Sequence, residues 1–230
     1  MSDLLKIFIG TEQLQKLPCA VLRYSMTRRS SVPIEFFEMQ DLNLGLESQM
    51  FTGFSIYRFH VPFLCGYKGR AISMDADIVC QADIAELYNL PMTSGAMARV
   101  KTGFATSVML LDCEKLKHWN VAEWAPRLKN RNIYQKTMWG RPGGLSTPDL
   151  TPLDPTWNQL DDFPAGTKQI HYTNIARQPW KNPGHPYACV FLKELKHAIE
   201  NGAITKETVL EEEGKQHVYT GLLNDAMAVK

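Results

Sequence analysis

The N-terminal segment carries the pattern that most constrains the fold. Residues 4–9 are an apolar run that ends at Gly10 and Thr11, as a buried strand ends in a turn. Across residues 13–27 apolar side chains recur at helical spacing, and residues 32–37 form a second apolar run. A strand, a helix and a strand in this order predict a βαβ unit. We therefore expect an α/β fold with a mostly parallel central sheet flanked by helices.

A later apolar run ends on two acids. Residues 69–74 lead directly into Asp75, Ala76 and Asp77, and residues 108–111 likewise lead into Asp112. In open α/β sheets, ligands bind in the crevice outside the carboxyl ends of the strands. The pattern predicts that Asp75 and Asp77 lie at that edge of the sheet.

The rest of the chain alternates helical segments with one long loop. Residues 113–124 and 187–200 have helical spacing, whereas residues 140–155 contain three glycines and four prolines, the composition of a loop. Such loops in compact domains are usually functional, so we expect a lid or one wall of a site there. We expect one domain over residues 1–204 and a peripheral tail over residues 205–230.

Composition and charge exclude several classes of protein. The 230 residues are 44% hydrophobic, enough for one sizeable core. Lys and Arg number 25 against 24 Asp and Glu, so the net charge of +1 gives no broad attraction to nucleic acid or an anionic membrane. No apolar stretch approaches the roughly 20 residues that span a bilayer, and the N-terminus resembles neither a signal peptide nor a transit peptide. We expect a cytoplasmic protein that binds no nucleic acid and has no transmembrane segment.

The cysteines point to core positions in a reducing compartment. They are odd in number, widely separated and mostly embedded in apolar runs, and no pair has the Cys-x-x-Cys spacing of a zinc or redox site. The five are Cys19, Cys65, Cys80, Cys113 and Cys189.

Asp75 and Asp77 carry the candidate chemistry. Alternate residues of a strand point to opposite faces, but at a strand end the chain turns, and two acids at this spacing can converge on one cation. Carboxylates are hard ligands suited to Mg²⁺ or Mn²⁺, and a cation between two phosphates neutralises a diphosphate leaving group. The alternative is a pair of solvated acids in a surface turn. Their position directly after a hydrophobic run favours the metal site.

The order and spacing of four blocks resemble family 8 of the glycosyltransferases, which includes glycogenin and bacterial lipopolysaccharide galactosyltransferases and glucosyltransferases. The blocks are residues 53–90, 107–113, 157–160 and 171–180, so the resemblance extends over most of residues 5–200. It implies a GT-A type fold, Rossmann-like, over residues 1–204. It also implies transfer of a hexose from a UDP-sugar, UDP-glucose or UDP-galactose, to a carbohydrate or other hydroxyl-bearing acceptor, with retention of anomeric configuration.

The resemblance also implies a metal site. The two family acids, here Asp75 and Asp77, hold Mn²⁺ between the donor phosphates, and a histidine matching His171 supplies the third protein ligand. Imidazole suits Mn²⁺ better than Mg²⁺, so this ligand set favours manganese, with Mg²⁺ as the alternative. Taken by itself, His171 would be a core histidine with its hydrogen bonds satisfied.

Other positions are implied to contact the donor. Arg58 lies seventeen positions before Asp75, as does the family arginine that approaches the donor. Gly10 and Thr11 match the positions where the family places the nucleotide base and ribose. Ala76 is also expected to bind the donor. The alternatives are a surface arginine on a helix for Arg58 and a plain β-turn for Gly10 and Thr11.

The chain departs from the family at the late motif and in the sugar-contacting block. The late motif of the family runs His, Gly, Lys, Pro, Trp. In this chain Asn174 stands where the glycine is expected, and Arg177 and Gln178 precede Pro179, so the motif is one residue longer. We expect either Arg177 or Gln178 to replace the phosphate-contacting lysine of the family. Ala105 stands where an asparagine is common, which weakens the expected contacts to sugar hydroxyls.

The reaction centre differs as well. Many members have Asp-Gln-Asp where this chain has Tyr134, Gln135 and Lys136. The resemblance implies front-face attack through an oxocarbenium-like ion pair, which needs no strong nucleophile, and the carbonyl of Gln135 could stabilise the positive charge of that ion pair. Gln135 is equally interpretable as a polar helix residue.

Two rival functions are considered. A sugar-1-phosphate nucleotidyltransferase would need a Gly-rich loop bearing Arg and Lys directly after the first strand, and residues 10–14 do not supply it. A non-catalytic nucleotide-sugar-binding domain is suggested by Ala105 and Lys136. Transfer or hydrolysis of the donor with Mn²⁺ would separate an enzyme from a binder.

Overall fold

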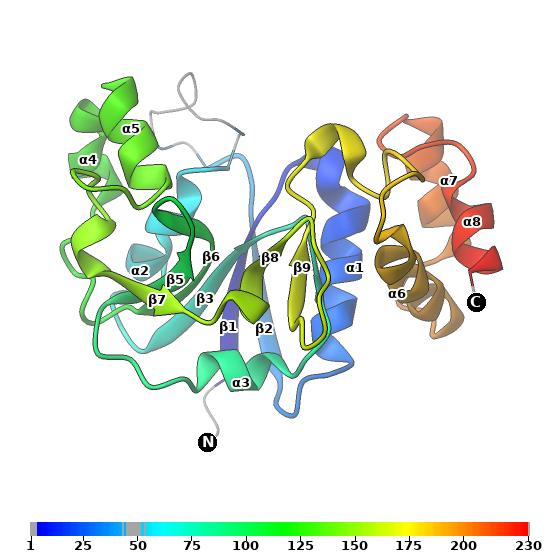
Figure 1. Ribbon diagram of the computed structural model, residues 1–230, viewed down its shortest axis with the longest axis horizontal. Helices are drawn as coiled ribbons and strands as arrows, with labels where there is room; N and C mark the ends of the chain where they lie inside the picture. The colour runs from blue at the N-terminus through cyan, green and yellow to red at the C-terminus, as the bar shows by residue number, and fades with distance from the viewer. Residues whose placement is uncertain (1–3, 43, 45–51, 53, 230) are drawn as a thin grey trace. The chain divides into compact units, whose positions relative to one another are not determined.

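A computed structural model describes residues 4–42, 44, 52 and 54–229, drawn in Figure 1. Gly53, with which the first family-like block begins, lies outside the described residues. The chain divides into two compact units, which are described separately. The first comprises Met1–Glu12, Val32–Asp75 and Ala85–Trp157, and the second comprises Gln13–Ser31, Ala76–Ile84 and Asn158–Lys230.

A six-stranded sheet organises the first unit, with strand order β2-β1-β3-β6-β5-β7 (Figure 1). Strand β1 pairs in parallel with β2 and β3, and β5 pairs in parallel with β7. Within this sheet, β6 runs antiparallel to its two neighbours. The prediction of a mostly parallel sheet is confirmed. The strands are β1 (Leu5–Gly10), β2 (Ile34–Met39), β3 (Arg70–Asp75), β5 (Ala96–Val100), β6 (Phe104–Asp112) and β7 (Leu150–Leu153).

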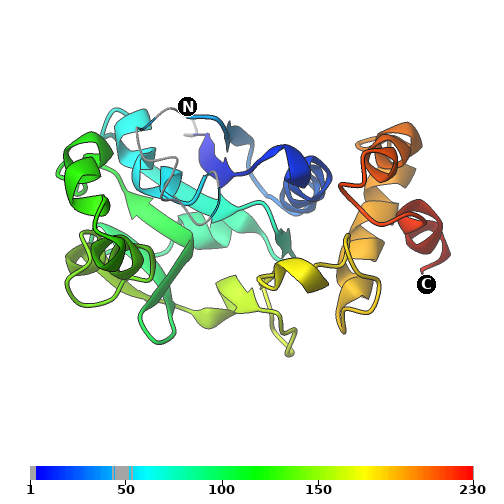
Figure 2. The same cartoon turned by 90° about the horizontal axis from the view of Figure 1, so that it is seen from above.

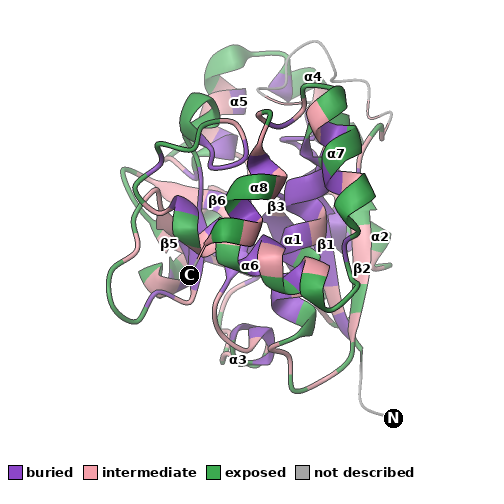
Figure 3. Ribbon diagram, turned by 90° about the vertical axis from the view of Figure 1, so that its right-hand side faces the viewer, coloured by how far each residue is buried: buried purple, intermediate pink, exposed green. Residues whose placement is uncertain are grey.

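The core of the first unit packs aromatic side chains beside this sheet. Strands β1 and β3 are largely buried, as their colouring in Figure 3 shows. The rings of Phe59, Trp119 and Trp124 contact one another, with centroids 5.4–6.0 Å apart. The helical segments of this part are η3 (Tyr57–Phe59), α2 (Val61–Leu64), α4 (Val121–Leu128), α5 (Arg131–Met138) and η4 (Thr147–Asp149), and α3 (Ile84–Tyr88) begins at the unit boundary.

Two boundaries differ from the sequence prediction. The helix expected over residues 113–124 begins only at Val121, because the side chain of Asn120 accepts hydrogen bonds from the first free backbone N–H groups of α4. The loop expected over residues 140–155 contains β7, which pairs with β5. β7 contains Pro152, one of the four prolines of this segment, but it lies at the sheet edge, where a missing backbone donor is tolerated.

The second unit contains a small sheet of order β4-β9-β8 and most of the long helices. Helices α6, α7 and α8 lie side by side, orange to red in Figure 2. Its core includes Tyr172, Trp180 and Phe191, whose rings contact in sequence at 5.9 and 5.1 Å between centroids. The elements are η1 (Gln13–Gln15), α1 (Lys16–Thr27), β4 (Ile78–Cys80), η5 (Pro155–Asn158, across the unit boundary), β8 (Gln159–Leu160), β9 (Gln169–His171), η6 (Ile175–Arg177), α6 (Ala188–Glu200), α7 (Lys206–Gly214) and α8 (Leu222–Ala228).

Residues 205–230 contribute to this core. Val209 of α7 and Leu222 of α8 are both fully buried in the cluster that contains Trp180. The division of the chain at residue 204 stays a prediction. Among the described residues, no helix is both long enough and apolar enough to cross a membrane.

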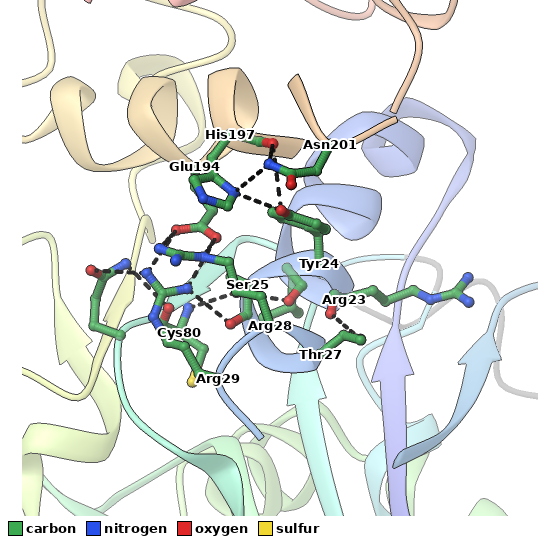
Figure 4. A network of polar contacts seen from close by, with 12 residues as sticks. Arg23, Tyr24, Ser25, Thr27, Arg28, Arg29, Cys80, Glu194, His197 and Asn201 are labelled. Atoms are coloured by element: carbon green, nitrogen blue, oxygen red, sulfur yellow. Dashed lines mark hydrogen bonds and ion pairs between the residues drawn. The ribbon is translucent and has the colours of Figure 1, made fainter. Parts of the chain in front are cut away.

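A buried carboxylate joins α1 to α6 (Figure 4). Glu194 of α6 accepts hydrogen bonds from Arg28 at 2.5 and 3.1 Å and from Arg29 at 3.0 and 2.8 Å. Ser25 lies in α1, shortly before these two arginines. Its hydroxyl accepts a 3.0 Å hydrogen bond from the backbone N–H of Cys80. This network fixes β4, the strand that follows Asp77 in the chain.

Candidate metal centre

The two predicted acids lie where a buried strand ends. Asp75 is the last residue of β3, whose four preceding residues are buried, and Asp77 directly precedes β4. Asp77 is itself buried, and the methyl group of Ala76 between the two acids is fully buried. Because a single residue separates Asp75 from Asp77, the proximity of their carboxylates follows from the chain itself.

His171 reaches Asp77 through the pairing of β4 with β9, in which Ile78 is opposite His171. Nε2 of His171 lies 2.9 Å from Oδ1 of Asp77. The other ring nitrogen, Nδ1, lies 3.0 Å from the amide oxygen of Asn158. An amide oxygen only accepts hydrogen bonds, so Nδ1 carries a proton, and in the neutral form of the imidazole the lone pair is on Nε2. This is the tautomer that a metal-binding histidine uses.

The contact between Asp77 and His171 is short but is not a hydrogen bond of good geometry. Oδ1 of Asp77 is buried and accepts no hydrogen bond from the part of the chain that the structure describes. A carboxylate oxygen buried beside an imidazole lone pair is unfavourable without a positive charge. The ligand atoms offered by Asp75, Asp77 and His171 all lie within 4.8 Å of one another. Two carboxylates and one imidazole therefore fit a divalent cation.

Gln178 holds the second oxygen of Asp77. Its amide nitrogen donates to Oδ2 of Asp77 at 3.0 Å and to the backbone carbonyl of Tyr172 at 3.0 Å. Both amide hydrogens are used in this way, and the side chain is buried. Gln178 therefore orients a carboxylate, whereas Arg177, the other predicted replacement for the family lysine, is exposed at the end of η6.

Sequence reasoning did not identify these orienting roles. Asn158 was predicted only as part of a family-like block, and Gln178 was one of two candidates, with Arg177, to replace the phosphate-contacting lysine. The available signal was a neutral amide in place of a basic residue beside the apolar Pro179 and Trp180. The signal could not have predicted the partner of that amide, because Asp77 is brought to Gln178 by the tertiary structure.

Arg58 is buried against the other acid. Its guanidinium donates to Oδ1 of Asp75 at 2.7 Å and to the hydroxyl of Thr106 at 3.3 Å. Thr106 in turn donates to the backbone carbonyl of Met138 at the end of α5. Only 8% of Arg58 is exposed, so the alternative of a surface arginine is wrong. Nε of Arg58 is buried and lacks a hydrogen-bond partner among the described residues, so one donor remains for a ligand.

Gly10 and Thr11 lie beside Asp75 at the sheet edge. The register of β1 and β3 puts Gly10 opposite Asp75. A Cβ atom at Gly10 would lie 2.6 Å from the ring of Phe54, so packing requires glycine there. The backbone N–H of Thr11 donates to Met39, extending the strand rather than forming a β-turn. The Thr11 hydroxyl is buried and has no hydrogen-bond partner in the described part of the chain.

Gln135 lies in α5 and is half-buried. The end of this helix is linked to Arg58 through Met138 and Thr106. A role of Gln135 at the reaction centre stays a prediction.

Comparison with known protein families matches residues 9–158, about two thirds of the chain, to Glycosyl transferase family 8. A curated relative, Protein CDI of Arabidopsis thaliana, is 35% identical over 96 residues, which are 37% of this chain and 36% of that protein. The match therefore covers little more than a third of the relative's length.

Solved structures of glycosyltransferases share the fold. The galactosyltransferase LgtC, in complex with donor and acceptor sugar analogs, has a TM-score of 0.62 and 11% identity over 87% of this chain and 100% of its own. GlyE of Streptococcus pneumoniae has a TM-score of 0.65 and 13% identity, and the match covers 95% of this chain and 65% of GlyE. The bifunctional glycosyltransferase WbbM has a TM-score of 0.62 and 13% identity, and the match covers 94% of this chain and 52% of WbbM. Identities this low show the fold alone, and it is of the predicted GT-A type.

Proposed function

The chain belongs to glycosyl transferase family 8, as its motifs predict, and from that premise we propose that it moves a hexose from a UDP-sugar to a hydroxyl acceptor with retention of configuration. Membership of the family implies a nucleotide-sugar donor and an acceptor. UDP-glucose and UDP-galactose are the proposed donors, and a carbohydrate or other hydroxyl-bearing molecule is the proposed acceptor. The observation that carries the proposal is the buried Oδ1 of Asp77, which accepts no hydrogen bond from the described residues and lies 2.9 Å from Nε2 of His171.

Asp75, Asp77 and His171 are the proposed metal ligands. Their two carboxylates and one imidazole favour Mn²⁺ over Mg²⁺. When bound, the cation would supply positive charge to the diphosphate leaving group. The protein's own contribution is to present all three ligand atoms together, within 4.8 Å of one another.

Gln178 and Asn158 are proposed to position these ligands. Gln178 donates to Oδ2 of Asp77, and Asn158 accepts from Nδ1 of His171. In each ligand residue this leaves the other polar atom, Oδ1 of Asp77 or Nε2 of His171, for the metal. Such partners fix the rotamer of a ligand and typically change metal affinity about 10- to 100-fold when they are removed. Because the amide hydrogens of Gln178 are occupied, Arg177 is the better candidate for contact with a donor phosphate.

Arg58, Gly10, Thr11 and Ala76 are proposed to bind the donor. Support for Arg58 comes from its burial beside Asp75 and from its Nε, which has no hydrogen-bond partner in the described part of the chain and can donate to a phosphate or a sugar hydroxyl. Support for Thr11 comes from its buried hydroxyl without a partner among the described residues. The main chain at Gly10 lies opposite Asp75, near enough for one ligand to contact both.

Catalysis is proposed to rest on positioning and electrostatic stabilisation rather than on a covalent intermediate. The acceptor hydroxyl attacks on the face from which the diphosphate departs. Gln135 is the proposed residue for stabilising positive charge on the sugar, through its amide carbonyl. The proposed metal site and leaving-group contacts do not depend on Gln135. They would stand even if Gln135 were found not to contact the donor.

A donor screen tests the proposal. Thermal shift with UDP-glucose and UDP-galactose is measured with and without Mn²⁺, and products are identified by mass spectrometry. We expect stabilisation that needs both donor and metal, since a ligand that binds the folded state raises its stability. Asp77→Asn should abolish it, whereas Glu207→Gln, at an exposed position of α7, should retain it. Metal-dependent binding without hydrolysis or transfer would indicate a binding domain, and the absence of binding would contradict the whole proposal.

A further inference from the structure

The turn between β5 and β6 and the segment that follows α5 form a surface of the first unit to which no role has yet been given. This hairpin surface comprises Lys101, Thr102, Lys136, Trp139 and Arg141. We propose that it binds an anionic sugar residue of the acceptor, one that carries a carboxylate or a phosphate group. On the proposed transferase function, on which the inference rests, this assigns a chemical class to the acceptor.

The β5–β6 hairpin extends past the sheet edge at which Asp75 lies. In the antiparallel pairing of β3 with β6, Met74 is opposite Val108, and β6 begins four residues earlier, at Phe104. At about 3.3 Å per residue, Phe104 lies about 13 Å beyond Val108 along the strand. A short oligosaccharide can extend over such a distance. A group on the hairpin can therefore contact a sugar that neighbours the one receiving the hexose.

Trp139 gives the hairpin surface an aromatic face. The side chain is 40% exposed, and the guanidinium carbon of Arg141 lies over the ring, 4.6 Å from its centroid. Arg141 also donates to the hydroxyl of Thr102 at 3.3 Å, and the carbonyl of Trp139 accepts a 2.8 Å hydrogen bond from Phe104. The ring and the guanidinium are thus held against the hairpin. An aromatic ring beside a guanidinium can stack on a sugar ring and hold its carboxylate or phosphate.

Glycine at position 103 permits this close packing. A Cβ atom there would lie 2.2 Å from the carbonyl oxygen of Trp139 and 2.9 Å from Cγ of Arg141. Lys136 reaches the same segment from α5, since a Cβ atom at Gly143 would lie 3.6 Å from its Nζ. The carbonyl of Lys136 also accepts a 2.8 Å hydrogen bond from the N–H of Arg141. An ammonium and a guanidinium therefore belong to one small region of the surface.

The charge of this region is positive. Residues 97–111 contain two basic residues and residues 124–148 contain five, and neither stretch contains an acid. In the part of the chain that the structure describes, Lys101, Lys136 and Arg141 form no ion pair with a carboxylate. Positive charge without acidic partners favours an anionic ligand. A net charge of only +1 means that the attraction is local to this surface.

Trp139 also supplies the readout of the experiment. Acrylamide quenches exposed tryptophans preferentially, and the other four are buried, namely Trp119, Trp124, Trp157 and Trp180. The probes are trigalacturonic acid with its neutral methyl ester, and galactose 6-phosphate with galactose, in EDTA and without donor. We expect an acidic probe, but not its neutral counterpart, to protect Trp139, and protection to weaken as NaCl is added. The probe that protects identifies a carboxylate or a phosphate as the recognised group.

Variants assign the binding to individual side chains. Arg141→Gln and Lys136→Gln should each weaken binding of the acidic probe about tenfold or more, as expected for loss of a hydrogen bond between charged groups. Trp139→Ala should abolish binding measured by calorimetry. Lys206→Gln removes the same charge from an exposed position of α7 and should leave the affinity unchanged. Circular dichroism establishes that each variant is folded.

Donor binding distinguishes an acceptor subsite from a donor site. Arg141→Gln should retain the Mn²⁺-dependent stabilisation by the UDP-sugar, and its loss would overturn the assignment to the acceptor. The probe measurements contain neither metal nor donor, so protection of Trp139 would be seen even if the proposed transferase function failed. No protection by either acidic probe, or equal protection by the methyl ester, would overturn the inference. Stronger binding to phosphatidylglycerol vesicles than to the acidic sugars would overturn it in favour of a membrane surface.

Discussion

Nε2 of His171 and Oδ1 of Asp77 lie 2.9 Å apart without a hydrogen bond of good geometry between them. The remaining polar atoms of both side chains are occupied, Nδ1 of His171 by Asn158 and Oδ2 of Asp77 by Gln178. Both side chains thus direct one ligand atom to the same place. Asn158 and Gln178, the proposed positioning residues, allow a test that separates metal binding from donor binding.

Gln178→Ala should weaken Mn²⁺ binding about 10- to 100-fold, because Asp77 loses the amide that fixes its rotamer. Titration calorimetry with MnCl₂ on the protein without donor measures this directly. Arg177→Ala is the matched comparison, since Arg177 is the exposed neighbour of Gln178. It should leave Mn²⁺ affinity unchanged and weaken the binding of UDP in the presence of metal. Equal effects of both variants on Mn²⁺ affinity would contradict the positioning role.

Glu194→Ala should destabilise the protein by about 3–5 kcal/mol, because it leaves the partly buried guanidinium of Arg29 and its neighbour Arg28 without their shared carboxylate. Urea unfolding followed by circular dichroism measures the change in free energy. Glu207→Ala, at an exposed site on α7, should change stability by less than about 0.5 kcal/mol. A loss below about 1 kcal/mol for Glu194→Ala would show that the network contributes little.

Stability should fall in acid partly through Glu194. Burial would raise the pKa of this carboxyl, but the hydrogen bonds from Arg29 and Arg28 outweigh it, and its pKa is lowered on folding. A lowered pKa means that the unfolded state binds the proton more tightly. The contribution is therefore complete above the unfolded carboxyl pKa, about 4.3, and is lost as pH falls through the folded value.

The measurement is the free energy of unfolding between neutral pH and the acid limb for the native protein and Glu194→Gln. The amide does not titrate, so the variant should lose less stability than the native protein as the pH falls below about 4.3. Identical slopes in the two proteins would rule out Glu194 as a source of the acid sensitivity.

Gly10→Ala should destabilise the first unit by about 1–3 kcal/mol, because the new methyl group would lie 2.6 Å from the ring of Phe54. Gly214→Ala is the control, since a Cβ atom at that helical glycine meets no atom within 4 Å. It should be neutral or stabilising by up to about 1 kcal/mol. Thermal unfolding compares the two variants, and a neutral Gly10→Ala would mean that the ring of Phe54 can move away.

Much of the fold could be predicted because it depends on local patterns. The apolar run before Gly10 and the run before Asp75 both became buried strands, since period and length suffice to recognise such segments. The prediction failed where pairing overrode composition. Residues 140–155 were predicted to be a loop from their glycine and proline content, yet residues 150–153 pair with β5 as an edge strand. The helix expected from residue 113 starts later because Asn120 caps it.

The sequence by itself determined that two carboxylates, Asp75 and Asp77, stand one residue apart at the end of a buried strand, because covalent spacing and hydrophobic periodicity are local properties. Only the tertiary structure decided which groups surround them. Pairing of β4 with β9 brings His171 to Asp77, and the fold directs Gln178 to the same carboxylate and Arg58 to Asp75. These contacts join residues distant in the chain, and their geometry depends on how whole elements pack, which no spacing along the sequence encodes.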